Sequence, residues 1–209
     1  MPTTTSNTAR AAILFTLGAA VGILILTGLR FAVQEPAHAV HYHANWAVFV
    51  DGTRVDLTAG RYMEDVFQCT MDAGHQRPEH RVHMHEGNHD VVHVHAAGVA
   101  WGHLLANLGF GVGDDYLETD RGTLASAEGR TLKFVLNGRP VSTIRNVPIE
   151  DRDRLLISFG SESVEEVVAS QFPEVGSDAG EYNLRPDPAS CSGPVEEGLG
   201  DRLRRAFLG

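Results

Sequence analysis

Cysteine and positive charge are both scarce in this chain of 209 residues. There are two cysteines, Cys69 and Cys191, and no C-x-x-C pair, so redox catalysis of the thioredoxin type lacks its motif. The formal net charge is -10, which argues against a nucleic-acid partner because such a partner requires a basic face. Hydrophobic content of 43% with 21% charged residues is ordinary for a globular domain.

One long apolar run stands near the N-terminus. The nineteen residues 11–29, "AAILFTLGAAVGILILTGL", carry no charge and lie between Arg10 and Arg30. As a helix they measure about 28 Å, close to the hydrocarbon thickness of a bilayer. A cleaved signal peptide has an apolar core of only about 7 to 15 residues, and the small-residue sequence "PAHA" ending at Ala39 lies far beyond the run. We favour an uncleaved single-pass anchor in the cell membrane, with a cytoplasmic N-terminus and an extracytoplasmic remainder, over a cleaved signal.

An extracytoplasmic location bears on the two cysteines and on the acidic charge. Outside the cytoplasm an even cysteine count usually means a disulfide, so a bridge between Cys69 and Cys191 is predicted. Metal ligation by Cys69 is the alternative. An acidic outer domain also raises the local concentration of cations, although solubility is the simpler explanation of its charge.

Two segments are typical of β-hairpins. Their turn pairs are Asp51-Gly52 and Asn137-Gly138, which suit the tight turns that join antiparallel strands. The expected strands are residues 40–50 with 53–57, and 132–136 with 141–144. A further strand is predicted for "RLLISFG", residues 154–160.

Helices are expected to be few and short. Trp101, Leu104, Leu105 and Leu108 follow the helical spacing, with Gly109 as the stop. Short helical segments are also expected in 62–68 and 163–172, whereas residues 173–200 are predicted to be an extended tail because they are rich in Pro, Gly, Ser and Asp. "DRLRRAFL" at the end is predicted to be an amphipathic turn or two, either docked on the body or at the membrane surface.

The order hairpin, helix, hairpin, strand is that of a β-grasp fold. "VLNGRPVSTIRNVPIEDRDRLLISFG" resembles the closing strands of ubiquitin-like and SLBB-like domains. We therefore predict an α+β, β-grasp-like mixed sheet with an inserted histidine-rich hairpin and one short helix, preceded by a single transmembrane helix. The expected divisions are residues 1–33 for the tail and anchor, 34–163 for the extracytoplasmic domain, and 164–209 for a C-terminal helix and tail.

The inserted hairpin concentrates histidine. All eleven histidines lie between residues 38 and 103, and six of them stand in "HRVHMHEGNHDVVHVH", residues 80–95. In an H-x-H strand both imidazoles point to one face. With a turn at 86–90, either His83 opposes His93, or a shifted register opposes His83 with His95 and His85 with His93. Both registers gather these four imidazoles on one face, and the residues that alternate with them predict a dry opposite face: Val82, Met84, Val92 and Val94.

A third H-x-H pair, His41 and His43, lies upstream on the first predicted strand. Opposed Cβ atoms in a sheet are about 4.5 to 5.5 Å apart, which lets imidazole nitrogens converge on one ion at about 2.0 to 2.1 Å. The predicted metal ligands are therefore His83, His85, His93 and His95, with His41 and His43 as further ligands or a second site. All-nitrogen ligation suits Zn or Cu(II), as well as Ni or Co, and we expect Zn or Cu. Residues around the turn could act as extra or outer ligands: His80, Glu86, His89 and Asp90. His103 is expected to be a surface histidine.

Three functions compete at this stage. The first is a membrane-anchored extracytoplasmic Zn- or Cu-binding protein. The second is a structural or interaction domain of a membrane complex with a pH-responsive histidine patch, because closely packed imidazolium ions repel one another. The third is a Zn-dependent hydrolytic enzyme with Glu86 as its base. Beyond a metal centre the sequence shows no catalytic constellation, so no enzyme class is assigned.

"HYHANWAVFVDG", "HMHEGNHDVVHVHAAGVAWGHLLANLGF" and "VLNGRPV" resemble a family of histidine-rich, membrane-anchored bacterial and archaeal proteins. The resemblance covers about residues 40–160, and the double H-x-H hairpin is its most specific part. Some members carry a protein-disulfide isomerase label, but this chain lacks the C-x-x-C that the activity needs. The resemblance implies that the six H-x-H histidines at 41, 43, 83, 85, 93 and 95 are shared by the family.

Overall fold

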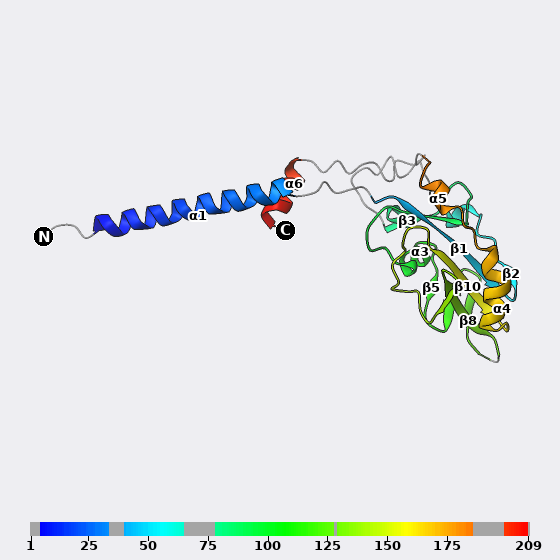
Figure 1. Cartoon of the computed structure of the whole chain (residues 1–209). Coiled ribbons are helices and arrows are strands. Elements are labelled where there is room, and N and C mark those ends of the chain that lie inside the picture. Colours follow the sequence, from blue (N-terminus) through cyan, green and yellow to red (C-terminus); the bar gives the residue numbers. More distant parts are fainter. Residues whose placement is uncertain (1–4, 34–39, 65–77, 128, 186–198, 209) are drawn as a thin grey trace. The chain divides into compact units, whose positions relative to one another are not determined.

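The structure is a computed structural model, and it describes residues 5–33, 40–64, 78–127, 129–185 and 199–208. These residues form two compact units. One contains the helices α1 (Thr5–Val33) and α6 (Leu199–Leu208), and the other contains everything described between residues 40 and 185 (Figure 1). The predicted disulfide between Cys69 and Cys191 lies outside the described residues.

Helix α1 is apolar on all sides. Its large hydrophobic side chains are exposed around the whole helix, for example Leu14 at 69% and Phe15 at 78%. Over Asn7–Val33 its length and composition are sufficient to cross a membrane. Among the described residues these apolar side chains are not buried, and a helix that is hydrophobic all round is typical of a buried or a membrane-spanning segment. The predicted C-terminal amphipathic helix is confirmed as α6.

The second unit is built on one mixed sheet, which confirms the α+β class. The strand order is β3-β4-β1-β10-β8-β9, and β2 also pairs with β1. Strand β1 runs parallel to β10, and the other pairs are antiparallel. The bounds are β1 Tyr42–Val50, β2 Thr53–Arg54, β3 Val82–His83, β4 Val91–Val94, β8 Thr131–Leu136, β9 Arg139–Val141 and β10 Arg154–Gly160.

Both predicted hairpin turns are confirmed. The φ angles are positive at both central residues of each turn, 48° and 73° at Asp51-Gly52 and 53° and 77° at Asn137-Gly138, as a type I′ turn requires. The returning strands are shorter than predicted. Leu57 and Ile144 lie beyond the ends of β2 and β9, and their side chains are buried in the core instead of extending the sheet.

A small second sheet was not predicted. It consists of β5 (Gly111–Val112), β6 (Tyr116–Thr119) and β7 (Gly122–Ala125). The strands are too short to show a clear alternation of apolar and polar residues in the sequence. Only Val112 of β5 and Leu117 of β6 are buried, and β7 buries no side chain. Strands of this length form only when a larger hydrophobic surface is available to receive them.

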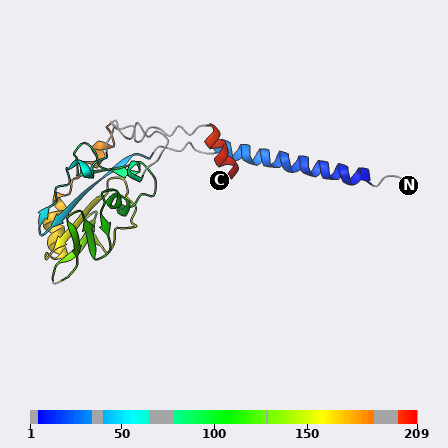
Figure 2. The same cartoon turned by 180° about the vertical axis from the view of Figure 1, so that it is seen from behind.

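The small sheet and helix α3 (Trp101–Asn107) contribute to the core on one face of the main sheet. Figure 2 shows α3 and the small sheet on the same side of the unit. Trp101, Leu104 and Leu105 of α3 are buried, which confirms the predicted amphipathic helix. They join an apolar cluster with Val112 and Leu117 of the small sheet. The main-sheet side chains of this cluster include Ala44, Trp46, Val48, Val82, Val92, Val94, Leu155 and Ile157.

The opposite face of the sheet is covered by the C-terminal part of the unit. A second apolar cluster includes Ala47, Phe49 and Val175. The covering elements are α4 (Val164–Glu166), the π-helical turn η3 (Val167–Gln171), η4 (Phe172–Glu174) and α5 (Ala179–Tyr182). The predicted short helix in 163–172 is therefore present, and Ser163 caps it by accepting from the Glu166 N–H at 3.2 Å.

The prediction of an extended tail from residue 173 is wrong for residues 173–185. Arg154 donates to the carbonyls of Val175 and Gly176 at 2.5 and 2.8 Å, and Asn45 donates to Asp178 Oδ1 at 2.7 Å. These bonds hold the segment on the sheet, so the compact unit continues past the boundary expected at residue 163. Two 3₁₀ turns complete the unit, η1 (Gly60–Tyr62) and η2 (Pro78–His80). Of the helical segment expected over 62–68, residues 65–68 lie outside the described chain.

Helix α3 approaches the loop before residue 148 so closely that it requires a glycine. The Gly102 N–H donates to the Arg145 carbonyl at 3.2 Å, and a Cβ at residue 102 would overlap that carbonyl oxygen. We predict that Gly102→Ala lowers the free energy of unfolding by about 1 to 3 kcal/mol, the usual cost of overpacking a rigid contact. Urea unfolding of the full-length protein in detergent, followed by near-UV circular dichroism, measures it.

Gly60→Ala is the matched control for this prediction. No heavy atom lies within 4 Å of a Cβ built at Gly60, so this variant should unfold at nearly the same urea concentration as the original protein. Equal stability of both variants would contradict the close contact at Arg145.

Candidate metal centre

Six histidine side chains meet on the face of the sheet opposite α3. The strands β3, β4 and β1 are neighbours, and His83, His93 and His43 stand directly across from one another in them. This is the first of the two registers that the sequence allowed. The set comprises His41, His43, His83, His85, His93 and His95, so the structure brings all six predicted residues together. Val82, Met84, Val92 and Val94 are fully buried on the other face, as predicted.

This face is buried rather than solvated. His43, His83, His85 and His93 are each 4% exposed or less, and His41 and His95 are half-buried. The C-terminal segment contributes to this burial, because the Tyr182 ring lies 5.8 Å from His43 and 6.3 Å from His93, centroid to centroid. Met84 accepts a hydrogen bond from the Trp46 indole N–H at 3.2 Å, so its sulfur belongs to the core and not to the histidine cluster.

His93 is the centre of the cluster. Its Nδ1 lies 2.9 Å from His43 Nε2 and 3.1 Å from His85 Nε2. The His41 ring stacks on His95 with a centroid separation of 5.1 Å. His41, His43 and His93 can each place one ring nitrogen within 4.8 Å of those of the other two, which makes them a group able to hold one metal ion.

The proton on His43 is fixed by Asn183. The Asn183 Oδ1 atom accepts the His43 backbone N–H at 3.0 Å and lies 2.7 Å from His43 Nδ1. The Asn183 amide nitrogen donates instead to Asp151 at 2.6 Å, so Oδ1 is the acceptor and His43 Nδ1 is the donor. In a neutral imidazole the lone pair is then on Nε2, the atom that faces His93.

His83 follows the same pattern on the other side of His93. Its Nδ1 lies 2.8 Å from the backbone carbonyl of Glu79, and a carbonyl can only accept, so Nδ1 carries the proton and Nε2 carries the lone pair. A hydrogen bond from Nδ1–H to a carbonyl or amide oxygen is the usual support of a metal-binding histidine. His43 and His83 are therefore in the tautomer that makes Nε2 a metal ligand.

The central imidazole, His93, is held in its neutral form. Burial is the largest effect and holds the pKa of His93 far below its ordinary value of 6.5. The neighbouring imidazoles of His85, His43, His83 and His95 lower it further, because a proton on any one of them repels a proton on His93. A neutral imidazole is the form that binds a transition metal.

The remaining predicted candidates have structural roles. His89 Nδ1 accepts the Leu57 N–H at 2.9 Å, and its Nε2 lies 3.1 Å from Asp90. His103 is exposed, as predicted, and its Nδ1 accepts the Ala100 N–H at 2.9 Å at the start of α3. In both residues the lone pair of one nitrogen is used by the backbone.

The acidic and histidine residues near the hairpin turn lie at the edge of the cluster. The Glu86 side chain is 59% exposed, and its Oε2 lies 3.7 Å from His85 Nδ1. His80 Nε2 lies 3.8 Å from Glu64 Oε1. Neither places a carboxylate among the central imidazole nitrogens.

Sequence reasoning missed the residues that cover and orient the cluster. Asn183, Tyr182 and Asp178 fall in a stretch that was assigned to an extended tail, and no periodicity marks them. Asn45 stands two residues after His43 in β1 and therefore lies on the same face. In the structure its Nδ2 donates to Asp178 Oδ1 and its Oδ1 accepts the Ala179 N–H. These two bonds attach the C-terminal segment to β1 beside His43.

Comparisons with protein-family models, with curated proteins and with solved structures found no match.

The buried, neutral state of His93 predicts acid sensitivity of the metal-free protein. The unfolded chain takes up a proton on this residue below pH 6.5, whereas the folded chain does not. The contribution of His93 to the free energy of unfolding is therefore fully present above about pH 6.5. Below that pH the free energy of unfolding falls by about 1.4 kcal/mol per pH unit for one such group. Urea unfolding in the presence of EDTA, repeated between about pH 5 and 7.5, measures the slope.

The comparison is His93→Gln, which removes the buried imidazole and should make the stability less dependent on pH. A metal-free protein whose stability is constant between about pH 5 and 7.5 would contradict the burial of a neutral His93.

Proposed function

We propose that this protein is a membrane-anchored transition-metal-binding protein whose ion is held by His41, His43 and His93. The supporting observation is the convergence of their ring nitrogens within 4.8 Å of one another. Ligand nitrogens bound at about 2.0 to 2.1 Å to one ion lie no more than about 4.2 Å apart. Because neighbouring nitrogens of a tetrahedral site lie about 3.3 to 3.4 Å apart, side-chain movements of up to about 1.5 Å close the group around an ion.

His85 and His83 are further candidate ligands, because they lie close to His93. His85 Nε2 is 3.1 Å from His93 Nδ1, and the His83 ring centroid is 5.8 Å from that of His93. The rings of His41 and His95 are stacked face to face, so His95 supports His41 from one side. We expect one ion per chain, because the described residues offer one group of three converging nitrogens.

The proposed ion is zinc or copper. Both accept all-nitrogen ligation by imidazole. Two nitrogens of a tetrahedral zinc site lie about 3.3 to 3.4 Å apart, so zinc would widen the present His43–His93 separation of 2.9 Å. Neighbouring positions of a tetragonal Cu(II) site are at about 90° and keep the nitrogens near 2.9 Å apart at the same bond length.

We further propose that the fold is a β-grasp with the histidine hairpin as an insertion. The support is the central parallel pair β1 and β10, flanked by β2 on one side and by β8 and β9 on the other. We also propose that α1 is an uncleaved anchor, that the second unit lies outside the cytoplasm, and that the chain belongs to the histidine-rich membrane-anchored family it resembles. The double H-x-H hairpin supports the family proposal.

Elemental analysis tests the metal proposal most directly. Full-length protein carrying no His tag is purified in detergent, supplied with Zn or Cu, and freed of loosely bound metal by gel filtration. The proposal expects about one equivalent of one transition metal per chain. Less than a tenth of an equivalent of either metal would sink it and would leave a structural or interaction domain as the better account of the cluster.

Removing two central ligands should abolish binding. In the double variant His43→Gln and His93→Gln we expect the retained metal to fall below a tenth of an equivalent, because only one imidazole of the proposed group is left. The matched control is His89→Gln with His103→Gln, which removes the same number of histidines outside the cluster and should keep full occupancy. Full occupancy in both variants would refute the assignment of His43 and His93.

Asn183 is proposed as a positioning residue for His43. In Asn183→Leu the Nδ1–H of His43 loses its acceptor, and we predict an affinity about 10- to 100-fold lower, the usual effect of removing the hydrogen-bond partner of a ligand histidine. The control is Asn88→Leu, which removes the bond of 2.7 Å from Asn88 to the Tyr182 hydroxyl and loosens the same segment without touching a histidine.

Nitrogen-15 NMR of the histidine rings separates positioning from a general loss of structure. The His43 tautomer should change in Asn183→Leu and persist in Asn88→Leu. An unchanged tautomer and an unchanged affinity in Asn183→Leu would contradict the role of this amide.

A further inference from the structure

Helix α6 exposes an apolar row that none of the described residues covers. Leu199, Leu203 and Phe207 are spaced by four residues and are 71%, 45% and 54% exposed. At about 100° per residue they form one stripe of the helix. Ala206, at the edge of this stripe, is buried at 1% exposure, and Arg202 and Arg204 stand on the two sides of the row. An exposed apolar stripe between arginines is the pattern of a helix that lies in a membrane interface.

The position of α6 on α1 supports this reading. The two helices belong to one compact unit, and Figure 1 shows α6 beside the C-terminal end of α1. The Arg202 guanidinium lies 4.5 Å from the ring centroid of Phe31, a cation-π contact. Phe31 stands next to Arg30 and close to Val33, where the apolar span ends. In a membrane-spanning helix that end lies at the lipid headgroups.

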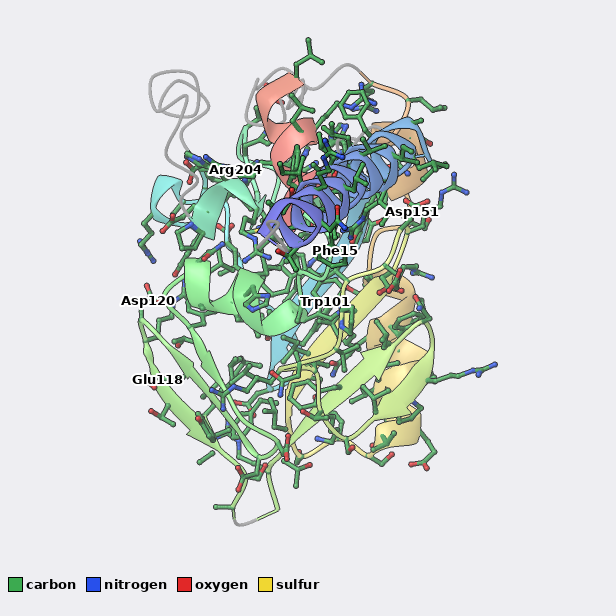
Figure 3. The ribbon with its side chains drawn as sticks, turned by 90° about the vertical axis from the view of Figure 1, so that its left-hand side faces the viewer. Phe15, Trp101, Glu118, Asp120, Asp151 and Arg204 are labelled. Carbon is green, nitrogen blue, oxygen red and sulfur yellow. The ribbon has the colours of Figure 1, made fainter. Side chains whose placement is uncertain are left out.

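The charge of α6 suits an anionic surface. Its sequence LGDRLRRAFL holds three arginines and one aspartate, and Arg30 adds a further positive charge at the end of α1. The chain as a whole has a net charge of -10, whereas α6 and the C-terminal end of α1 together carry a net positive charge. Arginines beside an apolar row keep their stems at the hydrocarbon edge and reach the lipid phosphates with their guanidinium groups. Figure 3 shows the side chains of this unit, with Arg204 labelled on α6.

We propose that α6 is an interfacial helix that binds anionic phospholipid headgroups at the end of the membrane anchor. Its row Leu199–Leu203–Phe207 enters the outer edge of the hydrocarbon, and its arginines pair with phosphate groups. The chain then contacts the bilayer at two elements far apart in the sequence. This proposal is independent of metal binding.

A tryptophan placed in the row tests the proposal. Phe207→Trp is prepared in the full-length protein and reconstituted in phosphatidylcholine vesicles, with and without phosphatidylglycerol, using lipids brominated near the headgroup end of the acyl chains. The native Trp46 and Trp101 are both fully buried in the core, so the difference from the original protein reports on residue 207. We expect strong quenching by brominated lipid, increased by phosphatidylglycerol, and little quenching by aqueous acrylamide.

Two arginines of α6 should account for the effect of anionic lipid. With Arg202→Gln and Arg204→Gln added to Phe207→Trp, the gain in quenching from phosphatidylglycerol should fall at least twofold. The control carries Arg121→Gln and Arg139→Gln, which change the net charge equally at exposed positions of the other unit, and it should keep the full gain.

Three results would overturn the proposal. Quenching by acrylamide and not by brominated lipid would place α6 in water. Equal quenching by brominated lipid with and without phosphatidylglycerol would contradict the proposed contact between α6 and anionic headgroups. Protection from both quenchers, together with a higher oligomer in detergent, would show that a second copy of the chain covers the row.

Discussion

The alternation of side chains along strand β1 is the constraint on which the rest of the second unit depends. Its even-numbered residues, such as Trp46 and Val48, enter the core on the α3 side. Its odd-numbered residues lie on the opposite face, where His43 and Asn45 precede Ala47 and Phe49. A shift of one residue in the pairing of β1 would exchange these faces, placing imidazoles in the apolar core. The same register that builds the core therefore builds the histidine cluster.

Burial of four imidazoles beside two half-buried ones is tolerable because hydrogen-bond acceptors hold the Nδ1 protons of His43 and His83. Asn183 and the Glu79 carbonyl accept the Nδ1 protons of His43 and His83, and this leaves lone pairs directed into the cluster. Burying polar groups is costly unless they are hydrogen-bonded, and adding a charge to such a cluster is more costly still. A metal cation gives several nitrogen lone pairs a partner at once, and the coordination bonds offset the cost of burying its charge, which is the physical reason for proposing metal binding.

The sequence predicted those elements whose signals are local. The turn pairs Asp51-Gly52 and Asn137-Gly138 require positive φ angles, the strand 154–160 contains the apolar run Leu155–Ile157, and the α3 residues Trp101, Leu104 and Leu105 repeat at helical spacing. The small sheet β5–β7 and the segment 173–185 were not predicted, because they are held by contacts distant in the sequence. Arg154 of β10 and Asn45 of β1 hold that segment by hydrogen bonds. No sequence pattern within residues 173–185 predicts these bonds.

The sequence by itself determined that an apolar helix precedes an α+β unit and that His83, His85, His93 and His95 share one face of a hairpin, because strand alternation has a period of two residues. Only the tertiary structure decided that β1 pairs with β4, which brings His43 beside His93. It also decided that the C-terminal segment lies against this face, so that the imidazoles are buried and their tautomers are set. These outcomes depend on pairing between strands about fifty residues apart and on the amide of Asn183, 140 residues from His43, and contacts of that range leave no local pattern.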